Sequence, residues 1–461
     1  MAKDTPSIPR GTRDFGPEQM KVRNHLFSII RSVFESFGFL PLETPAMENL
    51  SVLTGKYGDE GDQLIYKILN SGDFLSGVQA GDLDTGYKNL TRKISEKALR
   101  YDLTVPLARY VVMNRHQISF PFRRYQMQPV WRADRPSFGR YREFWQCDAD
   151  VVGTMSLVCE AEIFQMMVQV MQRLGLEDYH IKINHRKILS GLAAFCGAPG
   201  REAEMSVSLD KLDKVEWPVV EAEMHQKGFS TDFTQKLNSL RTGLIAPGSP
   251  AFSELAMRLE TESAASEGFS ELGRIFSYLQ PFPEVLEKIR FDLSLARGLS
   301  YYTGPIFELV PLGVKTGSIS GGGRYDELTS VFGVDGIPGV GFSFGIDRLV
   351  DLLTETGKLE SLETASSQAM LVMFEEQHIP QYLYLLADLR KAGIRCELYP
   401  EAHKLKKQFA YADARKFPVV LVLGEDEIRT GKITVKWLGT GSQETIETTD
   451  LPDRLQANPE N

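Results

Sequence analysis

Four arginines gather in the segment QPVWRADRPSFGRYREFWQCDADVVG, which predicts a strand, a basic loop and a second strand. Arg132 stands at the end of the first strand, and Arg135, Arg140 and Arg142 stand in or beside the loop. A guanidinium has fixed parallel donors that can bind phosphate oxygens in pairs. Arginines in a loop can also form an ordinary solvated surface. The segment alone therefore leaves phosphate binding and a solvated loop open.

Two later segments carry aromatic rings and glycines. LARGLSYYTGPIFE places Arg297 before Tyr301 and Tyr302, and SISGGGRYDEL contains three consecutive glycines, Gly321 to Gly323. By themselves, the tyrosines could simply alternate across a strand, one ring inward and one outward. The glycine run lacks the spacing and context of a phosphate loop. We therefore expect the glycines to allow close backbone packing beneath a substrate.

Composition indicates a folded, acidic protein. A chain of 461 residues, 42% of them hydrophobic, can bury a large core and suggests two to four domains. The net charge of -9 excludes a generally basic nucleic-acid coat protein, although an acidic enzyme can still hold RNA on a local basic face. Seven histidines without metal-binding spacing and four scattered cysteines predict neither a metal site nor a disulfide framework.

The N-terminal residues contain no apolar signal core, and the chain has no run of about 18 apolar residues that could span a bilayer. We therefore expect a cytoplasmic protein without a membrane segment.

The elements around these motifs predict a mixed domain. Apolar residues recur at helical spacing from 20 to 37, and the helix should end at the glycine that follows. Residues 175–288 combine charge with helical spacing, which predicts a helical insertion. Sequence patterns typical of strands follow it. Residues 68–96 are rich in Gly and Asp and predict a surface excursion to which we assign no role.

A second domain is predicted after a polar linker, TGKLESLETASS. Strand and helix patterns alternate beyond it and end in two strands, which indicates a small α/β unit. We place the two domains at 1–365 and 366–461. Several basic residues around one predicted helix could contact phosphates or form a solvated face; they are Lys404, Lys406, Lys407, Arg415 and Lys416.

Three segments in this order resemble the class II aminoacyl-tRNA synthetase family. The helix, strand and prolines from 20 to 45 are similar to motif one, the arginine segment to motif two, and PGVGFSFGIDRLV to motif three, with Arg348 at that motif's arginine. LARGLSYYTGPIFE and SGGGRYDEL resemble the two signatures of the histidyl members. LRYDLTVPLARYV is similar to the eukaryote-like version, with Asp102 where many bacterial members have glutamate.

The resemblance implies a fold and an activity. The fold is α/β (α+β), with a catalytic domain on an antiparallel sheet, a helical insertion and a smaller C-terminal anticodon-binding domain. The activity is that of a histidine–tRNA ligase, which joins L-histidine to ATP as histidyl-adenylate, releases pyrophosphate and transfers histidine to the 3′ end of tRNA(His). Mg²⁺ is expected to accompany ATP, and the chain is expected to form a homodimer.

The resemblance also distributes roles among residues. The catalytic residues are expected to be Arg132 and Arg297. The expected histidine-binding residues are Asp102, Thr104, Gln146, Asp150, Tyr301 and Tyr302. The expected ATP-binding residues are Arg132, Asp134, Arg140, Arg297 and Arg348, and Asp134 stands where the family commonly has glutamate. The expected tRNA-binding residues are Arg135, Arg140, Lys404 and Lys407.

Two other classes of protein share parts of this pattern. A catalytically inactive relative that serves as the regulatory subunit of ATP phosphoribosyltransferase would be a binding module, but such relatives usually lose the histidyl signatures and the anticodon domain. An RNA-binding or stress-sensing protein with a synthetase-like domain would need extra domains. Because the chain contains both the signatures and the second domain pattern, the sequence favours the enzyme.

Overall fold

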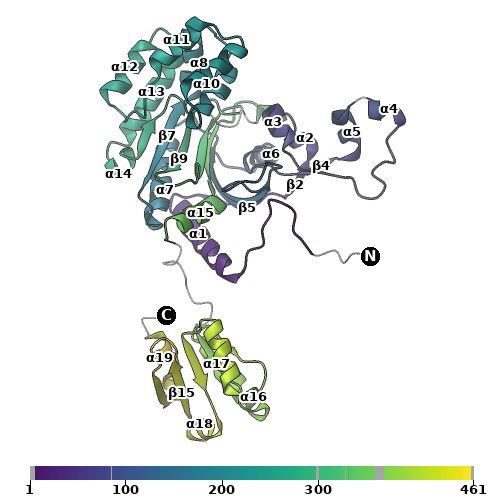
Figure 1. Cartoon of the computed structure of the whole chain (residues 1–461), viewed down its shortest axis with the longest axis vertical. Helices are drawn as coiled ribbons and strands as arrows, with labels where there is room; N and C mark the ends of the chain where they lie inside the picture. The colour runs from purple at the N-terminus through teal and green to yellow at the C-terminus, as the bar shows by residue number, and fades with distance from the viewer. Residues whose placement is uncertain (1–5, 85, 297–300, 328, 359–367, 458–461) are drawn as a thin grey trace. The chain divides into compact units, whose positions relative to one another are not determined.

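The computed structural model describes residues 6–84, 86–296, 301–327, 329–358 and 368–457. The chain divides into two compact units. The larger unit spans positions 1–16 and 23–359, and the smaller unit spans positions 17–22 and 360–461. Figure 1 shows the elements of each unit.

An eight-stranded sheet forms the centre of the larger unit (Figure 1). Its neighbouring strands are antiparallel except for the outermost pair at each edge, which is parallel. This confirms the predicted antiparallel catalytic sheet. In spatial order, its strands are β1 (Leu40–Pro41), β5 (Phe122–Trp131), β6 (Glu143–Val152), β11 (Gly339–Gly345), β10 (Ser320–Tyr325), β9 (Pro305–Pro311), β7 (Tyr179–His185) and β8 (Ile289–Phe291).

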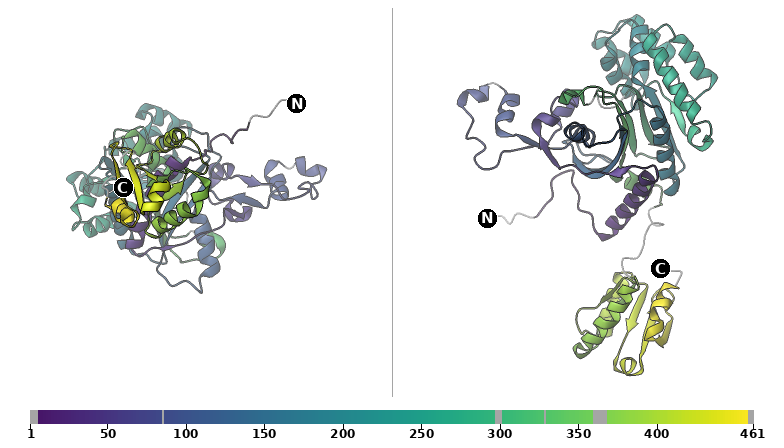
Figure 2. Two further views of the ribbon diagram at one scale, coloured as in Figure 1. Left: turned by 90° about the horizontal axis from the view of Figure 1, so that it is seen from below. Right: turned by 180° about the vertical axis from the view of Figure 1, so that it is seen from behind.

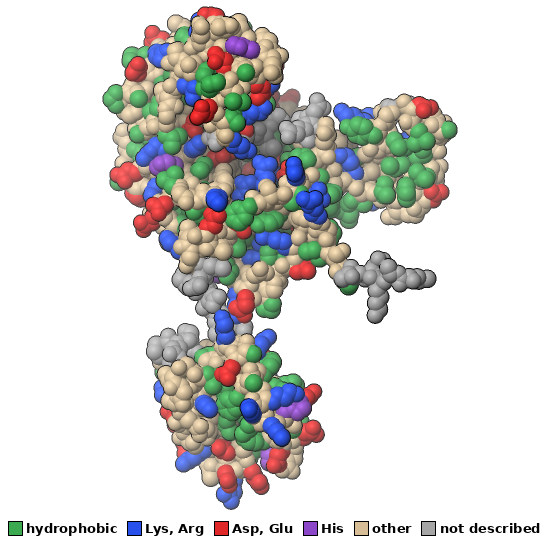
Figure 3. Space-filling view, in the orientation of Figure 1, with side chains coloured by type: hydrophobic (Ala, Val, Ile, Leu, Met, Phe, Trp, Pro, Cys, Tyr) green, Lys and Arg blue, Asp and Glu red, His purple; other side chains and the backbone are tan. Residues whose placement is uncertain are grey.

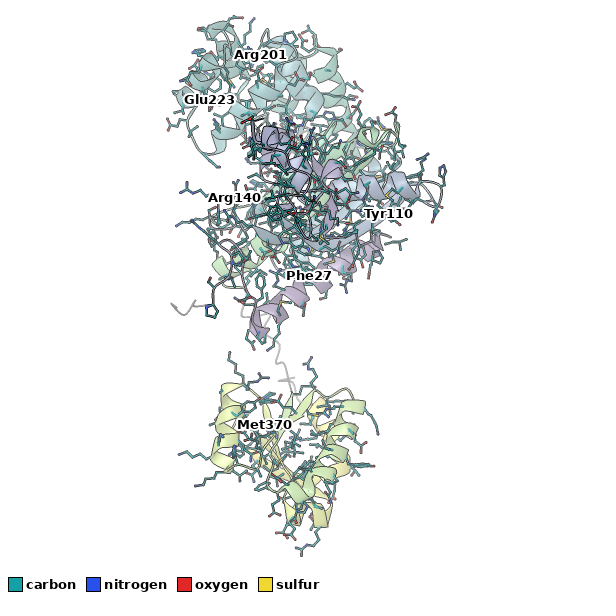
Figure 4. All side chains as sticks on the ribbon, turned by 90° about the vertical axis from the view of Figure 1, so that its right-hand side faces the viewer. Phe27, Tyr110, Arg140, Arg201, Glu223 and Met370 are labelled. Atoms are coloured by element: carbon teal, nitrogen blue, oxygen red, sulfur yellow. The ribbon has the colours of Figure 1, made fainter. Side chains whose placement is uncertain are left out.

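Aromatic side chains fix two helices, α1 (Pro17–Ser36) and α7 (Val158–Arg173), on one face of this sheet. A further helix, α15 (Ile346–Glu355), follows β11 directly. Phe27 of α1, labelled in Figure 4, packs 5.0 Å from the ring of Trp145 on β6. Phe164 of α7 packs 5.0 Å from Phe307 on β9. Because strand residues alternate between faces, the opposite face is free to carry a site.

A smaller sheet and several short helices adjoin β5. The sheet contains β2 (Met47–Asn49), β4 (Lys97–Leu99) and β3 (Lys67–Ile68), in that order. The helices are α2 (Leu50–Leu53), α3 (Gly58–Gln63), α4 (Ala80–Asp84), α5 (Tyr87–Ile94) and α6 (Thr104–Asn114). The excursion at 68–96 contains α4 and α5 and extends away from the large sheet, as Figure 2 also shows. Figure 3 shows apolar side chains on its surface, where Leu83 is 67% exposed.

The helical insertion begins later than the sequence predicted. Residues 179–185 form β7 because YHIKINH alternates, with Ile181 and Ile183 buried in the sheet. The helices that follow are α8 (Arg186–Phe195), α9 (Glu202–Leu209), α10 (Trp217–Gln226), α11 (Thr231–Leu240), α12 (Pro250–Arg258), α13 (Ser263–Tyr278) and α14 (Pro283–Leu286).

The smaller unit is a five-stranded sheet with helices, as the alternating pattern predicted. In spatial order, its strands are β13 (Cys396–Leu398), β12 (Ala369–Leu371), β14 (Val419–Val422), β15 (Lys432–Trp437) and β16 (Gln443–Glu447). Its helices are α16 (Ile379–Lys391), α17 (Leu405–Ala414), α18 (Glu425–Thr430) and α19 (Leu451–Gln456). Both faces of the sheet are packed, because Leu371 belongs to one buried cluster and Met370, labelled in Figure 4, to another.

A search of the residues with described positions found no helix that is both long and apolar enough to cross a membrane.

Candidate active site

A cavity of about 510 Å³ lies on the sheet face opposite α1 and α7, and the first residues of α15 contribute to its lining. Side chains of β6 and β11 alternate so that Phe144, Gln146, Ser343 and Gly345 face it together. Six residues from the predicted site line the cavity; they are Arg132, Asp134, Arg140, Gln146, Tyr302 and Arg348. The structure therefore brings parts of the predicted ATP and histidine sites into one space.

Glycines on β10 and β11 contribute to the floor of the cavity and to the packing beneath it. A Cβ on Gly341 would lie 2.0 Å from Oδ1 of Asp150, and one on Gly323 would lie 2.8 Å from the ring of Tyr302. These glycines let the carboxylate and the ring lie against the backbone. At Gly321, by contrast, the nearest atom would be 3.6 Å away, which leaves room for a methyl group. The expected close packing at the glycine run is confirmed at Gly323.

Arginines form one side of the cavity. Nε of Arg132 donates to the carbonyl of Tyr101 at 3.1 Å, and its guanidinium lies 4.3 Å from the Tyr101 ring centre. Nε of Arg348 donates to the carbonyl of Gly139 at 2.9 Å. Arg140 is exposed at the cavity border, whereas Arg135 is exposed but does not contribute to the lining. Several cations therefore face one space, an arrangement that suits a polyphosphate.

A wall of hydroxyl and carboxyl groups borders the other side. Gln146 and Tyr302 line the cavity, and Nε2 of Gln146 donates to Oγ of Ser343 at 3.1 Å. Asp102 lies behind the lining, where it accepts hydrogen bonds from Tyr57 at 2.9 Å and from Tyr301 at 3.4 Å. Burial raises the pKa of Asp102. The carboxyl group is thus held in place by two phenols.

Thr104 also lies behind the lining, at the start of α6, beside the phenol of Tyr301. Asp102, Thr104 and Tyr301 therefore form one group just outside the cavity surface.

Two further carboxyl groups lie deeper on the same face of β6. Asp150 faces Arg124 across the β5–β6 pair, and their charged atoms are 2.8 Å apart. Tyr325 donates to the other oxygen of Asp150 at 2.7 Å. Burial raises the pKa of Asp150 and raises that of Asp148 to about 7, while the nearby Arg124 guanidinium lowers both. Asp150 is therefore engaged on both oxygens and does not line the cavity.

Several acceptors in this wall have no hydrogen-bond donor among the described residues. They are Oε1 of Gln126, Oε1 of Gln146 and Oδ1 of Asp148. Buried acceptors of this kind are normally satisfied, and Gln146 is the one of these three residues that lines the cavity, so its Oε1 is suited to an N–H group on a bound molecule.

The sequence interpretation did not select Asp148, Arg124 or Tyr57. Asp148 could have been found, because it lies two residues from both Gln146 and Asp150 on one strand face. Tyr57 carries no comparable signal, because its contact with Asp102 joins positions 45 residues apart.

Two predicted site residues lie elsewhere, and one is outside the described residues. Arg297 is outside the described residues, although Leu295 and Tyr302 on either side of it in the sequence line the cavity. Lys404 and Lys407 belong to the smaller unit, at the start of α17, where both are exposed. Within the described ranges, no group of three or more His, Cys, Asp or Glu side chains could hold a metal ion.

Family profiles match most of the chain. A profile described as histidyl-tRNA synthetase matches residues 75–349, and one described as an anticodon binding domain matches residues 368–458.

Individual proteins are similar to this chain over almost its full length. Proteins named histidine–tRNA ligase from Cytophaga hutchinsonii and Phocaeicola vulgatus are 52% and 47% identical, over 98% of this chain and 100% and 98% of their own. The crystal structure of histidyl-tRNA synthetase from a Nostoc species matches with a TM-score of 0.81 and 30% identity, over 98% of this chain and 99% of that chain. With described residues of both signatures lining one cavity, this chain belongs to the histidyl-tRNA synthetase family.

Proposed function

We propose that the chain ligates histidine to its tRNA, with both chemical steps in the cavity on the large sheet. The observation that carries the proposal is the meeting, at one cavity, of an arginine side with a side of amide and phenol groups that has carboxyl groups directly behind it. The full-length similarity to histidine–tRNA ligases supports the same reaction. Histidine and ATP first give histidyl-adenylate and pyrophosphate, and the 3′ end of tRNA(His) then accepts histidine.

The first step joins two anions. The histidine carboxylate attacks the α-phosphorus of ATP, so positive charge must balance both the reacting oxygens and the transition state. Arg132 is suited to this role because Tyr101 holds its guanidinium at the cavity surface. We assign Arg297 to the same task from the family signature. Together, the two arginines would align the carboxylate with the α-phosphate.

The carboxyl, amide and phenol side would recognise histidine. Asp102 and Thr104 are assigned to the α-ammonium end, with Tyr301 positioning Asp102 through its hydrogen bond. Gln146 is assigned near the carboxylate or ammonium group, and Asp150 with Tyr302 to the imidazole. Arg124 and Tyr325 already engage both oxygens of Asp150, so Asp150 would act from behind the lining and Tyr302 at the cavity surface. A site that hydrogen-bonds a ring N–H rejects analogues that lack it, because its buried acceptor then stays unpaired.

The arginine side would hold ATP. Arg348 and Arg140 are assigned to the outer phosphates or the adenine face, and Asp134 to the adenine. Mg²⁺ would accompany the triphosphate, and lining carboxylates, Glu308 among them, would supply oxygen, the donor this ion prefers. When bound, the ion neutralises the β- and γ-oxygens of the leaving pyrophosphate.

The tRNA would contact both units. Arg135 and Arg140 are exposed on the loop beside the cavity and are assigned to phosphates of the acceptor stem. Lys404 and Lys407 are exposed at the start of α17 in the unit that matches the anticodon-binding profile. Phosphate contacts of this kind position an RNA without reading its sequence.

We also assign a homodimer and a cytoplasmic location. β1 is an edge strand of the large sheet, and Leu40 in it is 62% exposed. An exposed apolar edge favours pairing with another chain, and oligomers of one chain are normally symmetric. A light-scattering mass equal to one chain would contradict the dimer.

The central test is exchange of pyrophosphate into ATP by the purified protein. Exchange is expected with histidine and absent with each other amino acid. Exchange driven equally by a second amino acid would overturn the substrate assignment. No exchange from folded protein that still binds histidine would favour a binding module instead of an enzyme.

A further inference from the structure

The N-terminal segment 10–15 packs on the loop that carries the ATP-side residues. The backbone N–H of Arg142 donates to the carbonyl of Gly11 at 2.8 Å, and a guanidinium nitrogen of Arg142 reaches the carbonyl of Arg10 at 3.3 Å. The carbonyl of Arg142 in turn accepts from the backbone N–H of Arg132 at 3.0 Å. The segment is thus two hydrogen bonds away from the proposed catalytic arginine.

Gly11 makes this approach possible. Its φ is +88°, and a Cβ at this position would lie 2.8 Å from Cγ of Pro136 and 2.9 Å from Cγ of Arg142. Both neighbours belong to the loop between β5 and β6. Glycine is therefore required here for its backbone conformation and for the closeness of the loop.

Arg13 joins the same loop to α15. Its guanidinium lies 3.4 Å from the centre of the Tyr141 ring and forms an ion pair with Asp347, which is buried. Tyr141 and Asp347 both line the cavity, and Arg348 follows Asp347 in the sequence. The hydroxyl of Tyr141 donates to Asp351 at 3.0 Å. Arg13 therefore contacts both the β5–β6 loop and α15, the two elements that carry the residues assigned to ATP.

The fold does not depend on Arg13 alone. Asp347 also pairs with the buried Arg23 at 2.8 Å and accepts the backbone N–H of Trp145 at 3.0 Å. Removing Arg13 therefore leaves the Asp347 carboxylate with its other partners. A buried charge that loses its partner normally destabilises a protein, and this effect is avoided here.

We propose that the segment 10–15 positions the β5–β6 loop for ATP, with Arg13 as its positioning residue. This rests on the proposed assignment of the arginine side to ATP. A loop that is already ordered loses less conformational entropy when the nucleotide binds. Among the described residues, Arg13 contacts Phe15, Tyr141 and Asp347, and none of these is assigned to histidine. Arg13 should therefore affect ATP and leave histidine recognition unchanged.

The test measures histidine-dependent pyrophosphate exchange, with ATP and histidine titrated separately. Arg13→Ala is expected to raise the KM for ATP about tenfold, equivalent to about 1.4 kcal/mol, and to keep the KM for histidine within about twofold. Arg13→Lys keeps a charge beside Asp347 but loses the planar contact with Tyr141, so a rise of about threefold is expected. Thermal melting checks that each variant is folded.

Two further variants separate the possible outcomes. Arg115→Ala removes an exposed arginine at the end of α6 and should match the unchanged protein. Arg348→Ala tests the ATP side itself and should raise the KM for ATP. If Arg348→Ala does so while both Arg13 variants stay within twofold, the inference is wrong. Equal increases in both KM values for the Arg13 variants would also overturn it. An unchanged Arg348→Ala would remove the ATP assignment and the inference together.

Discussion

Arg132 is held from two directions, which fixes the orientation of its charge. Its Nε donates to the Tyr101 carbonyl, and its guanidinium also lies 5.2 Å from the ring centre of Phe144. Lysine carries the same charge but cannot reproduce this planar, hydrogen-bonded arrangement. We therefore expect Arg132→Lys to lower single-turnover adenylate formation by about 10²-fold, the scale for a lost charge-stabilising donor. Rapid-quench assays with saturating substrates measure it, and a rate within threefold would remove the catalytic assignment.

The buried carboxyl of Asp148 predicts a dependence of stability on pH. Burial raises its pKa to about 7, above the value near 3.9 of an unfolded aspartate. Between these values the folded state binds more protons, so the stabilisation is present at low pH and is lost as pH rises through 7.

Asp148→Asn removes this titration. Its melting temperature relative to the unchanged protein should therefore increase by a few degrees between pH 5.5 and pH 8. Calorimetry at both pH values measures the difference. A constant difference would show that Asp148 does not titrate in this range.

At the scale of residues, the sequence predicted the types of the site residues better than their distance from the cavity surface. Gln146 and Tyr302 line the cavity, but Asp102 and Asp150 lie behind it, because strand alternation gives the face of a residue and not its distance from a ligand. The pairing of Asp150 with Arg124 depends on the register of β5 and β6, which no local pattern reports. The role of Arg297 stays a prediction.

At the scale of elements, the glycines of β10 and β11 differ in role: one is required for packing within the protein, and another leaves room for a ligand. A methyl group on Gly341 would overlap Asp150, whereas one on Gly321 would meet protein atoms only at 3.6 Å or more and would extend toward the cavity. We expect Gly341→Ala to lower the melting temperature by several degrees. Gly321→Ala should melt within about two degrees of the unchanged protein and yet lower kcat/KM at least tenfold.

Melting curves and exchange kinetics on the same preparations compare the two variants. Gly273→Ala in α13 serves as the control, since a Cβ there meets no atom within 4 Å. Full activity of a stable Gly321→Ala would show that no substrate lies over this part of the floor.

The order of elements was largely predictable, whereas one boundary was not. The helix at 20–37 corresponds closely to α1 because its apolar period is long, and the strand, loop and strand predicted from the arginine segment correspond to β5 and β6. β7 was assigned to the helical insertion because it is short and the stretch from 175 to 288 as a whole is rich in charge and helical spacing. Its place between β9 and β8 is set by tertiary pairing, which overrides a weak local signal.

At the scale of the whole molecule, each unit has its own core. The smaller unit buries Leu386 and Val435 in one cluster and Val420 in another, and the cavity residues all belong to the larger unit. We therefore expect a chain that ends at Ser366 to fold and to form histidyl-adenylate. Charging should fall sharply, because losing a second binding region forfeits a gain in affinity that can reach about 10²–10⁴.

Exchange and aminoacylation should be measured together on the full and shortened chains, with circular dichroism to establish folding. Because the missing contacts act through tRNA affinity, more tRNA should partly restore charging by the shortened chain, while exchange stays near that of the full chain. Lys404→Ala with Lys407→Ala in the full chain should cause a smaller loss of the same kind, with a weaker salt dependence of tRNA binding. Equal charging by both chains at low tRNA would refute the anticodon-binding role of the smaller unit. An unfolded shortened chain would instead refute the independence of the two cores.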